Sequence, residues 1–86
     1  MSDGSNKISI QVLFFGLTAD AVGRRSLNLE VAESATAQQA IESVVKTNTK
    51  LDGQKLLFAV NQRYLPAKTI LNDGDELAIF TAVSGG

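Results

Sequence analysis

The stretch ISIQVLFF, residues 8–15, has the alternation of a β-strand. Every even position in it is apolar, while the odd positions are polar up to residue 11 and apolar from Leu13 onward. Successive side chains of a strand point to opposite faces of a sheet. The stretch therefore predicts a strand with one buried face, and with Leu13 and Phe15 on the outer face near its end.

Further segments with apolar periodicity follow this strand, separated by short breaks. The turn sequence LNDGD at 71–75 is the strongest of these breaks. The predicted elements, in chain order, are one or two helical turns at 17–23, a strand at 25–31, a helix from 37 to about 47, a strand at 56–60, a short strand at 63–65 and a last strand at 76–83. Leu17, Ala21 and Val22 are predicted to share one side of the helical turns at 17–23, which end at Gly23. In the last strand, alternation places Leu77 and Ile79 inward and Phe80 outward.

The segment that follows Thr36 is the one clear amphipathic helix of the sequence. Thr36 fits the N-cap position, because its hydroxyl can accept a hydrogen bond from an amide of the first turn. Apolar residues recur along one side at helical spacing, namely Ala37, Ala40, Ile41, Val44 and Val45. One helix lying across one sheet buries one face of each, so the sequence predicts a two-layer α+β domain.

The composition excludes several kinds of function. The 86 residues fit one domain, predicted to span 7–82 after a disordered tail at 1–6. The absence of Cys and His excludes thiol nucleophiles, Ser-His-Asp triads and Cys/His metal sites. A net charge of −1 argues against nucleic-acid binding, and no apolar run approaches the roughly 20 residues of a membrane span. The N-terminus has no secretory signal, so we expect a cytoplasmic protein without nucleic-acid or membrane partners.

The chain ends in Ser84-Gly85-Gly86, directly after the last predicted strand. Two glycines without Cβ atoms make the narrowest and most flexible peptide, so residues 83–86 are predicted to be a flexible tail that can enter a tight channel. A terminal carboxylate that ATP activates as an adenylate can exchange the adenylate for sulfur and become a thiocarboxylate. A frayed chain end without function is the alternative, and the dipeptide alone does not decide between the two.

Phe15, Tyr64 and Phe80 form a candidate partner surface. Alternation places Phe15 and Phe80 outward, and Tyr64 lies next to Pro66, a residue that suits a sheet edge. Outward aromatic side chains near one end of a sheet often mark a partner surface. The alternative is that a loop covers Phe15 or Phe80.

Four short motifs together resemble the MoaD-type sulfur carriers, the small subunits of molybdopterin synthase, which have a ubiquitin-like β-grasp fold. The motifs are VLFF at 12–15, AVNQ at 59–62, LNDGDE at 71–76 and VSGG at 83–86. The resemblance covers nearly everything from Lys7 to Gly86. It implies a mixed sheet of about four to five strands packed on one main helix, with the first and last strands side by side and parallel.

The resemblance also implies a function for the end of the chain. Gly86 would carry the thiocarboxylate, as a C-terminal 1-thioglycine, without any bound cofactor. An adenylyltransferase that resembles a ubiquitin-activating enzyme (E1) would activate it with ATP, and a sulfurtransferase would supply the sulfur indirectly. Val83, Ser84 and Gly85 would insert with Gly86 into the large subunit of molybdopterin synthase. That subunit converts cyclic pyranopterin monophosphate (precursor Z) to molybdopterin.

The same resemblance assigns the partner contacts and the alternatives. The family's apolar contacts map onto Phe15, Tyr64 and Phe80, and the chain itself would be a non-catalytic subunit. The family commonly has Phe-Pro-Pro-Val before its two glycines, whereas residues 80–83 here are FTAV. Without the prolines, φ at the root of the tail is less restrained. Carriers for cysteine, thiazole or tRNA thiolation, and ubiquitin-like modifiers joined to lysines, therefore remain alternatives.

Overall fold

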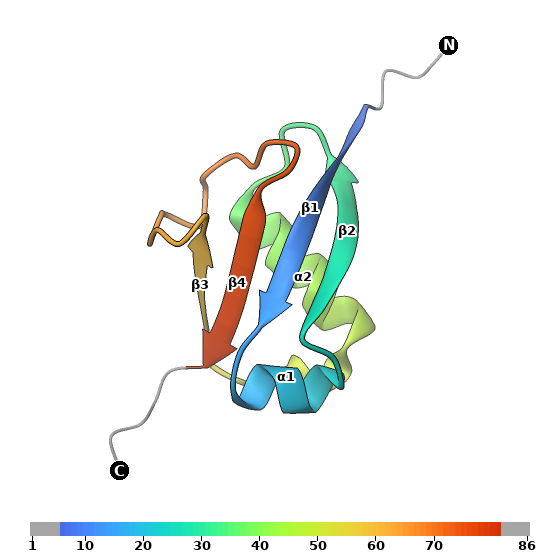
Figure 1. Ribbon diagram of the computed structural model, residues 1–86, viewed down its shortest axis with the longest axis vertical. Helices are drawn as coiled ribbons and strands as arrows, with labels where there is room; N and C mark the ends of the chain where they lie inside the picture. The colour runs from blue at the N-terminus through green and yellow to red at the C-terminus, as the bar shows by residue number, and fades with distance from the viewer. Residues whose placement is uncertain (1–5, 82–86) are drawn as a thin grey trace.

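The computed structural model describes residues 6–81, which form a four-stranded sheet with one main helix across it (Figure 1). The elements in chain order are β1 (Lys7–Phe14), α1 (Leu17–Val22), β2 (Ser26–Ala32), α2 (Ala37–Thr47), the 3-10 turn η1 (Thr49–Leu51), β3 (Leu56–Val60) and β4 (Glu76–Thr81). The strand order across the sheet is β2-β1-β4-β3. The predicted α+β class is confirmed.

The two central strands, β1 and β4, run parallel, with Val12 opposite Leu77 and Phe14 opposite Ile79. The outer strands β2 and β3 pair antiparallel with β1 and β4. The parallel pairing of the first and last strands is the arrangement that the family resemblance implied. Because parallel strands finish at the same edge of a sheet, the chain leaves β1 and β4 at the same end of the molecule.

The core lies between α2 and the covered face of the sheet. The predicted alternation of residues 8–15 is confirmed, since Ile10, Val12 and Phe14 are buried and the odd positions are not. The buried side chains from both layers form one cluster, which contains Ile10, Val12, Phe14, Val31, Ala35, Ala37, Ala40, Val44, Leu51, Val60, Leu71, Leu77 and Ile79. Burial of these apolar side chains is the main term that stabilises the fold.

Helix α2 begins where the sequence predicted. The Thr36 hydroxyl accepts from the Gln39 amide at 3.2 Å, and the Gln39 side chain accepts from the Thr36 amide at 2.9 Å. This reciprocal capping box satisfies two of the amides that a helix start leaves unpaired. At the other end, the Asn48 amide donates to the carbonyls of Val44 and Val45, and η1 follows.

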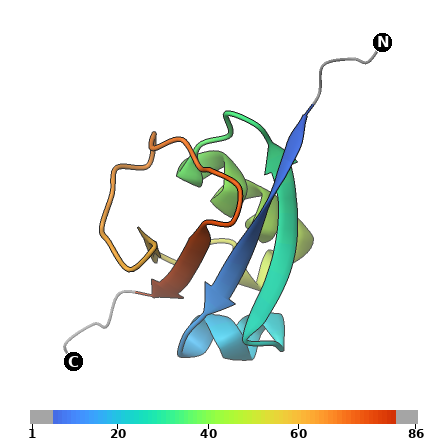
Figure 2. The ribbon, with the colours of Figure 1, turned by 45° about the horizontal axis from the view of Figure 1, so that its top comes forward.

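The predicted short strand at 63–65 is wrong. Asn61 and Gln62 have φ values of 51° and 67° and form a tight turn, after which a single bridge pairs Val60 with Arg63. The chain then leaves the sheet in a long excursion to β4, which Figure 2 shows on the β3 side. Pro66, which lacks an amide hydrogen for a strand ladder, lies in this excursion.

Leu17 was predicted to share one side of α1 with Ala21 and Val22, but only those two pack against the core. Leu17 is 65% exposed, and the buried position in α1 belongs to Thr18. Gly16 has a φ of 59°, so the chain turns sharply between β1 and α1 and presents Leu17 to the outside. Glycine adopts this backbone conformation without the steric penalty that a Cβ would bring.

Several sequence predictions fall outside the described residues. They are residues 1–5 of the predicted N-terminal tail, the last two positions of the strand predicted at 76–83, and the predicted tail at 83–86. The domain bounds 7–82 stay a prediction. Among residues 6–81, no helix is both long and apolar enough to cross a membrane.

Candidate protein-interaction site

The open face of the sheet, opposite α2, becomes apolar toward the end where β1 and β4 finish. Strand pairing brings Leu13 beside Ala78 and Leu57 beside Phe80, and directly paired residues share a face. At the other end of this face, Gln11 pairs with Glu76. The apolar part is therefore confined to one end of the open face.

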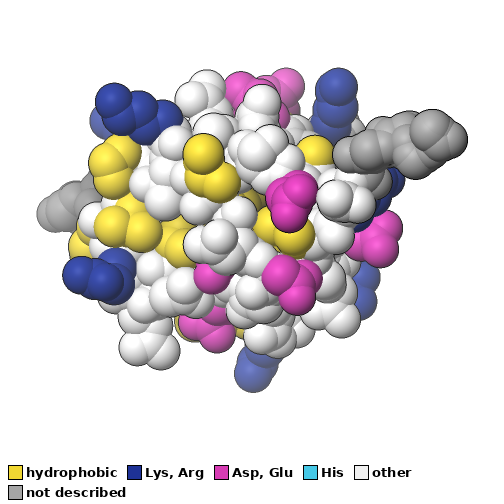
Figure 3. All heavy atoms as spheres, turned by 90° about the horizontal axis from the view of Figure 1, so that it is seen from above, with side chains coloured by type: hydrophobic (Ala, Val, Ile, Leu, Met, Phe, Trp, Pro, Cys, Tyr) yellow, Lys and Arg dark blue, Asp and Glu magenta, His cyan; other side chains and the backbone are white. Residues whose placement is uncertain are grey.

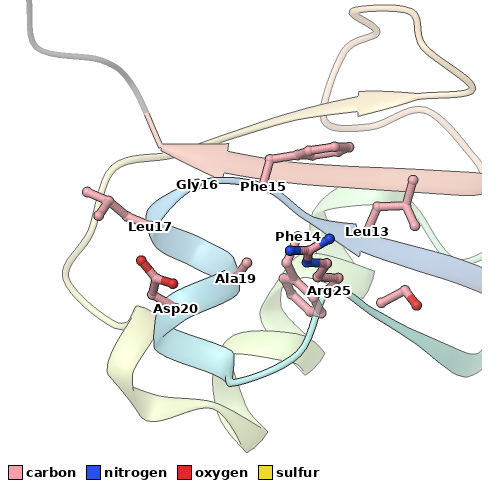
Figure 4. A pocket seen from close by; sticks show the side chains of 9 residues that line it. Leu13, Phe14, Phe15, Gly16, Leu17, Ala19, Asp20 and Arg25 are labelled. Carbon is pink, nitrogen blue, oxygen red and sulfur yellow. The ribbon is translucent and has the colours of Figure 1, made fainter.

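We use the name aromatic patch for the surface formed by three aromatic residues and one leucine, namely Phe15, Tyr64, Phe80 and Leu57. Phe15 is 51% exposed and Tyr64 is 80% exposed, and Leu57 is exposed as well. The Phe15 amide donates to the Ile79 carbonyl at 3.1 Å, which holds Phe15 next to β4. Figure 4 shows its ring extending along the β4 ribbon.

Phe80 lies on the open face but is only partly exposed. Its ring centroid is 6.2 Å from that of Tyr64, and the two rings meet edge to face at 72°. This geometry is one that aromatic pairs favour. Tyr64 therefore covers part of Phe80, so two of the three aromatic residues selected from the sequence are in direct contact.

Thr18 joins the end of β1 to the end of β4, and sequence reasoning missed it. Its side chain is fully buried. The hydroxyl accepts from the Phe15 amide at 3.0 Å, and its hydrogen is shared between the carbonyls of Phe15 at 2.7 Å and Ile79 at 2.9 Å. A threonine in a six-residue helix carries no sequence signal for such a role. It holds Phe15 close to the strand that leads to the end of the chain.

Leu57 was missed for a different reason. The run LLFAV at 56–60 has no polar positions, so hydrophobicity does not show which face each side chain takes. Alternation alone would have placed Leu57 and Ala59 on the same face. The pairing of Leu57 with Phe80 identifies that face as the open one.

The acidic turn before β4 has a structural role. Asp75 accepts from the Asn61 side chain at 3.0 Å and from the Asn72 amide at 2.7 Å, while Asp73 accepts from the Ser9 amide at 2.8 Å. These bonds tie the acidic turn to β1 and to the turn at Asn61 and Gln62, which follows β3. All three lie at the end of the sheet opposite α1. Within residues 6–81 no group of His, Cys, Asp and Glu side chains is arranged to hold a metal ion.

The residues predicted to carry the chemistry, Gly86 with Val83, Ser84 and Gly85, lie outside the described residues. The structure does show the residue at which the described part of the chain ends. Thr81, the last residue of β4, comes directly after Phe80 of the aromatic patch. The arrangement can therefore bind a protein beside the root of the chain's last residues.

A mixed four-stranded sheet with parallel central strands, packed on one helix, defines a ubiquitin-like β-grasp protein. Residues 12–86 match the model of the ThiS family. The chain is 36% identical over 81 residues to the molybdopterin synthase sulfur carrier subunit of Haemophilus influenzae, over 90% of this chain and 99% of that one. The chain therefore belongs to the ThiS family, and its recognition as a MoaD-type ubiquitin-like protein is confirmed.

Solved structures agree on the fold. A putative molybdopterin converting factor subunit 1 from Pyrococcus furiosus has a TM-score of 0.83 at 24% identity, over 88% of this chain and 99% of that chain. One chain of a protein–protein complex of subunits 1 and 2 of the molybdopterin-converting factor from Helicobacter pylori also matches. It has a TM-score of 0.63 at 20% identity, over 92% of this chain and all of that one.

Proposed function

We propose that this chain is a sulfur carrier that acts as the small subunit of molybdopterin synthase. The observation that carries the proposal is the 36% identity, over nearly the full length of both chains, to a protein named as that subunit. The family match also runs through Gly85 and Gly86, the residues to which the chemistry is assigned.

The proposed reagent is the carboxyl group of Gly86. Its oxygen attacks the α-phosphorus of ATP on the E1-like adenylyltransferase, and pyrophosphate leaves. Sulfur at the oxidation level of sulfide, supplied indirectly by a sulfurtransferase, then adds to the acyl carbon, and AMP leaves. On the large subunit, the sulfur of the resulting thiocarboxylate forms a bond to a carbon of precursor Z, and water then cleaves the acyl C–S bond, so that the sulfur stays on the acceptor and Gly86 returns to a carboxylate. This route needs no acid, base or metal from the β-grasp body, which serves to bind partners.

The aromatic patch is the proposed contact with the large subunit and with the adenylyltransferase. Phe15, Tyr64 and Phe80 lie beside the end of β4, so a partner that covers them would receive Val83, Ser84 and Gly85 next to its own surface. Each large apolar side chain buried in such a contact contributes roughly 1.5–3 kcal/mol. The contact therefore supplies affinity, while Gly86 supplies the reacting group.

Intact-mass measurement tests the chemistry directly. The chain is co-expressed with the cognate adenylyltransferase and a sulfur source, and we expect a gain of about 16 Da, the difference between oxygen and sulfur, that maps to Gly86. A variant that lacks Gly85 and Gly86 is the control and should show no gain. If a known carrier is converted under the same conditions and this chain is not, the proposal is wrong. Lysine adducts that bear a Gly-Gly remnant would instead support the modifier alternative.

A further inference from the structure

An open groove of about 720 Å³ lies between the end of β1 and α1 (Figure 4). Tyr64 and Phe80, the two aromatic rings in contact, do not line it. Phe15 and Leu17 form its apolar wall, and both are more than half exposed. They flank Gly16, whose φ of 59° turns the chain so that both side chains project outward. Large apolar side chains that are adjacent and exposed indicate a surface that a partner covers.

The groove has opposite charges at its two ends. Arg25 lines it on the β2 side and Asp20 lines it on the α1 side, and Figure 4 shows Ala19 of α1 between the two. Arg24 and Arg25 are both exposed. A complementary segment would therefore present a carboxylate to Arg25 and an apolar side chain to Phe15 and Leu17.

The arrangement of the remaining charges favours an acidic partner at this end. Arg24 and Arg25 follow α1 directly, and Lys55 precedes β3, which starts at the same end of the sheet. The turn with Asp73 and Asp75 lies at the opposite end, where Figure 3 shows acidic side chains interspersed with Lys and Arg side chains. Beside the groove, the two basic residues Arg24 and Arg25 outnumber the one acidic residue that lines it, Asp20.

We propose that this groove docks an acidic segment of the large subunit, one that carries a carboxylate next to an apolar side chain. The inference rests on the proposed function and adds the chemistry of the partner. Phe15 belongs both to the groove and to the aromatic patch, so one partner can cover the two surfaces together. The apolar wall supplies affinity, and Arg25 selects for the carboxylate and accelerates association.

Calorimetric titration of the large subunit with the full chain, at low and high salt, tests the groove. Arg25→Glu should lower the affinity about tenfold or more at low salt and flatten its salt dependence. Lys68→Glu makes the same change in net charge on an exposed side chain far from α1, and its affinity should stay within about twofold of the parent. Leu17→Ser, which removes only the apolar contact, should cost about tenfold with the salt dependence unchanged.

The outcomes separate this inference from the proposed function. If Arg25→Glu and Leu17→Ser bind like the parent chain while Tyr64→Ala binds more weakly, the groove proposal is overturned and the carrier function stands. Equal losses for Arg25→Glu and Lys68→Glu would show a net-charge effect and also overturn it. A parent chain that does not bind the large subunit overturns the proposed function and this inference together. Thermal melting of each variant, whose substituted side chain is exposed, confirms that the fold is intact.

Discussion

The helix-covered face and the open face of the sheet come from the same four strands, yet their apolar side chains have different surroundings. On the covered face, Val12, Leu77 and Ile79 are fully enclosed by α2 and its neighbours. On the open face, Leu57 and Tyr64 stay exposed. Near the α1 end hydrophobicity alone does not distinguish the two faces, because both are apolar there, whereas the polar Ser9 and Gln11 further back in β1 mark the open face. The difference indicates that stability and partner binding can be separated by mutation.

The largest loss of stability is expected on the covered face. Leu77→Ala removes a fully buried side chain and should lower the free energy of unfolding by about 2–5 kcal/mol, through lost burial and the cavity left behind. Urea denaturation followed by circular dichroism measures it. A loss smaller than that of the open-face variants would contradict the assignment of this face as the core.

Thr18→Val comes next, because it keeps the shape of the side chain and removes the hydroxyl. The Phe15 amide loses a partly buried hydrogen bond and the Ile79 carbonyl loses a buried one, while the two stay bonded to each other. The loss of the hydroxyl's bonds is expected to cost about 1–3 kcal/mol. Thr18→Ser keeps the hydroxyl and is the matched control. If the two variants unfold at the same urea concentration, the hydroxyl does not hold the strand ends together.

Phe80→Ala tests a side chain that is neither fully buried nor fully exposed. Since Phe80 is partly covered by Tyr64, we expect it to lose about 1–2 kcal/mol of stability. Its affinity for the large subunit should fall about tenfold or more, as for a central interface residue. Unfolding and calorimetric titration of the same preparation separate these effects. A stability loss of about 3–5 kcal/mol with unchanged affinity would place Phe80 in the core.

The smallest change in stability is expected for Tyr64→Ala. Tyr64 is 80% exposed, so the free energy of unfolding should stay within about 0.5 kcal/mol of the parent. Binding to the large subunit should nevertheless weaken, and Tyr64→Phe, which keeps the ring, should restore it. Unchanged binding in Tyr64→Ala would remove Tyr64 from the proposed contact.

Local patterns predicted most of the fold. The alternation of residues 8–15, the spacing of Ala40 and Val44, and the capping threonine at 36 each depend on neighbours within one strand or one helical turn. Such patterns can be read without knowledge of the rest of the chain, because the side-chain period of each element is set by its backbone. The error at 63–65 and the exposed position of Leu17 both follow tight turns with residues at positive φ, Asn61 and Gln62 in the first case and Gly16 in the second.

The candidate site was predicted less completely than the fold. Outward alternation identified Phe15 and Phe80, but the contact between Phe80 and Tyr64 depends on the path of the chain after the β3 turn. Thr18 bonds to Ile79, which lies 61 residues further along the chain. A short-range pattern contains no information about such a pair. The groove likewise combines residues from β1, α1 and the start of β2.

The amino-acid sequence by itself determined which side chains are apolar at strand or helix spacing, where α2 begins, and that the match to the ThiS family runs to residue 86. The tertiary structure decided which face of β3 carries Leu57, and it brought the ends of β1 and β4 together beside Tyr64 and Thr18. The physical reason is the range of the interactions. Periodicity is local, whereas strand pairing and the packing of one layer on another join residues far apart in the chain.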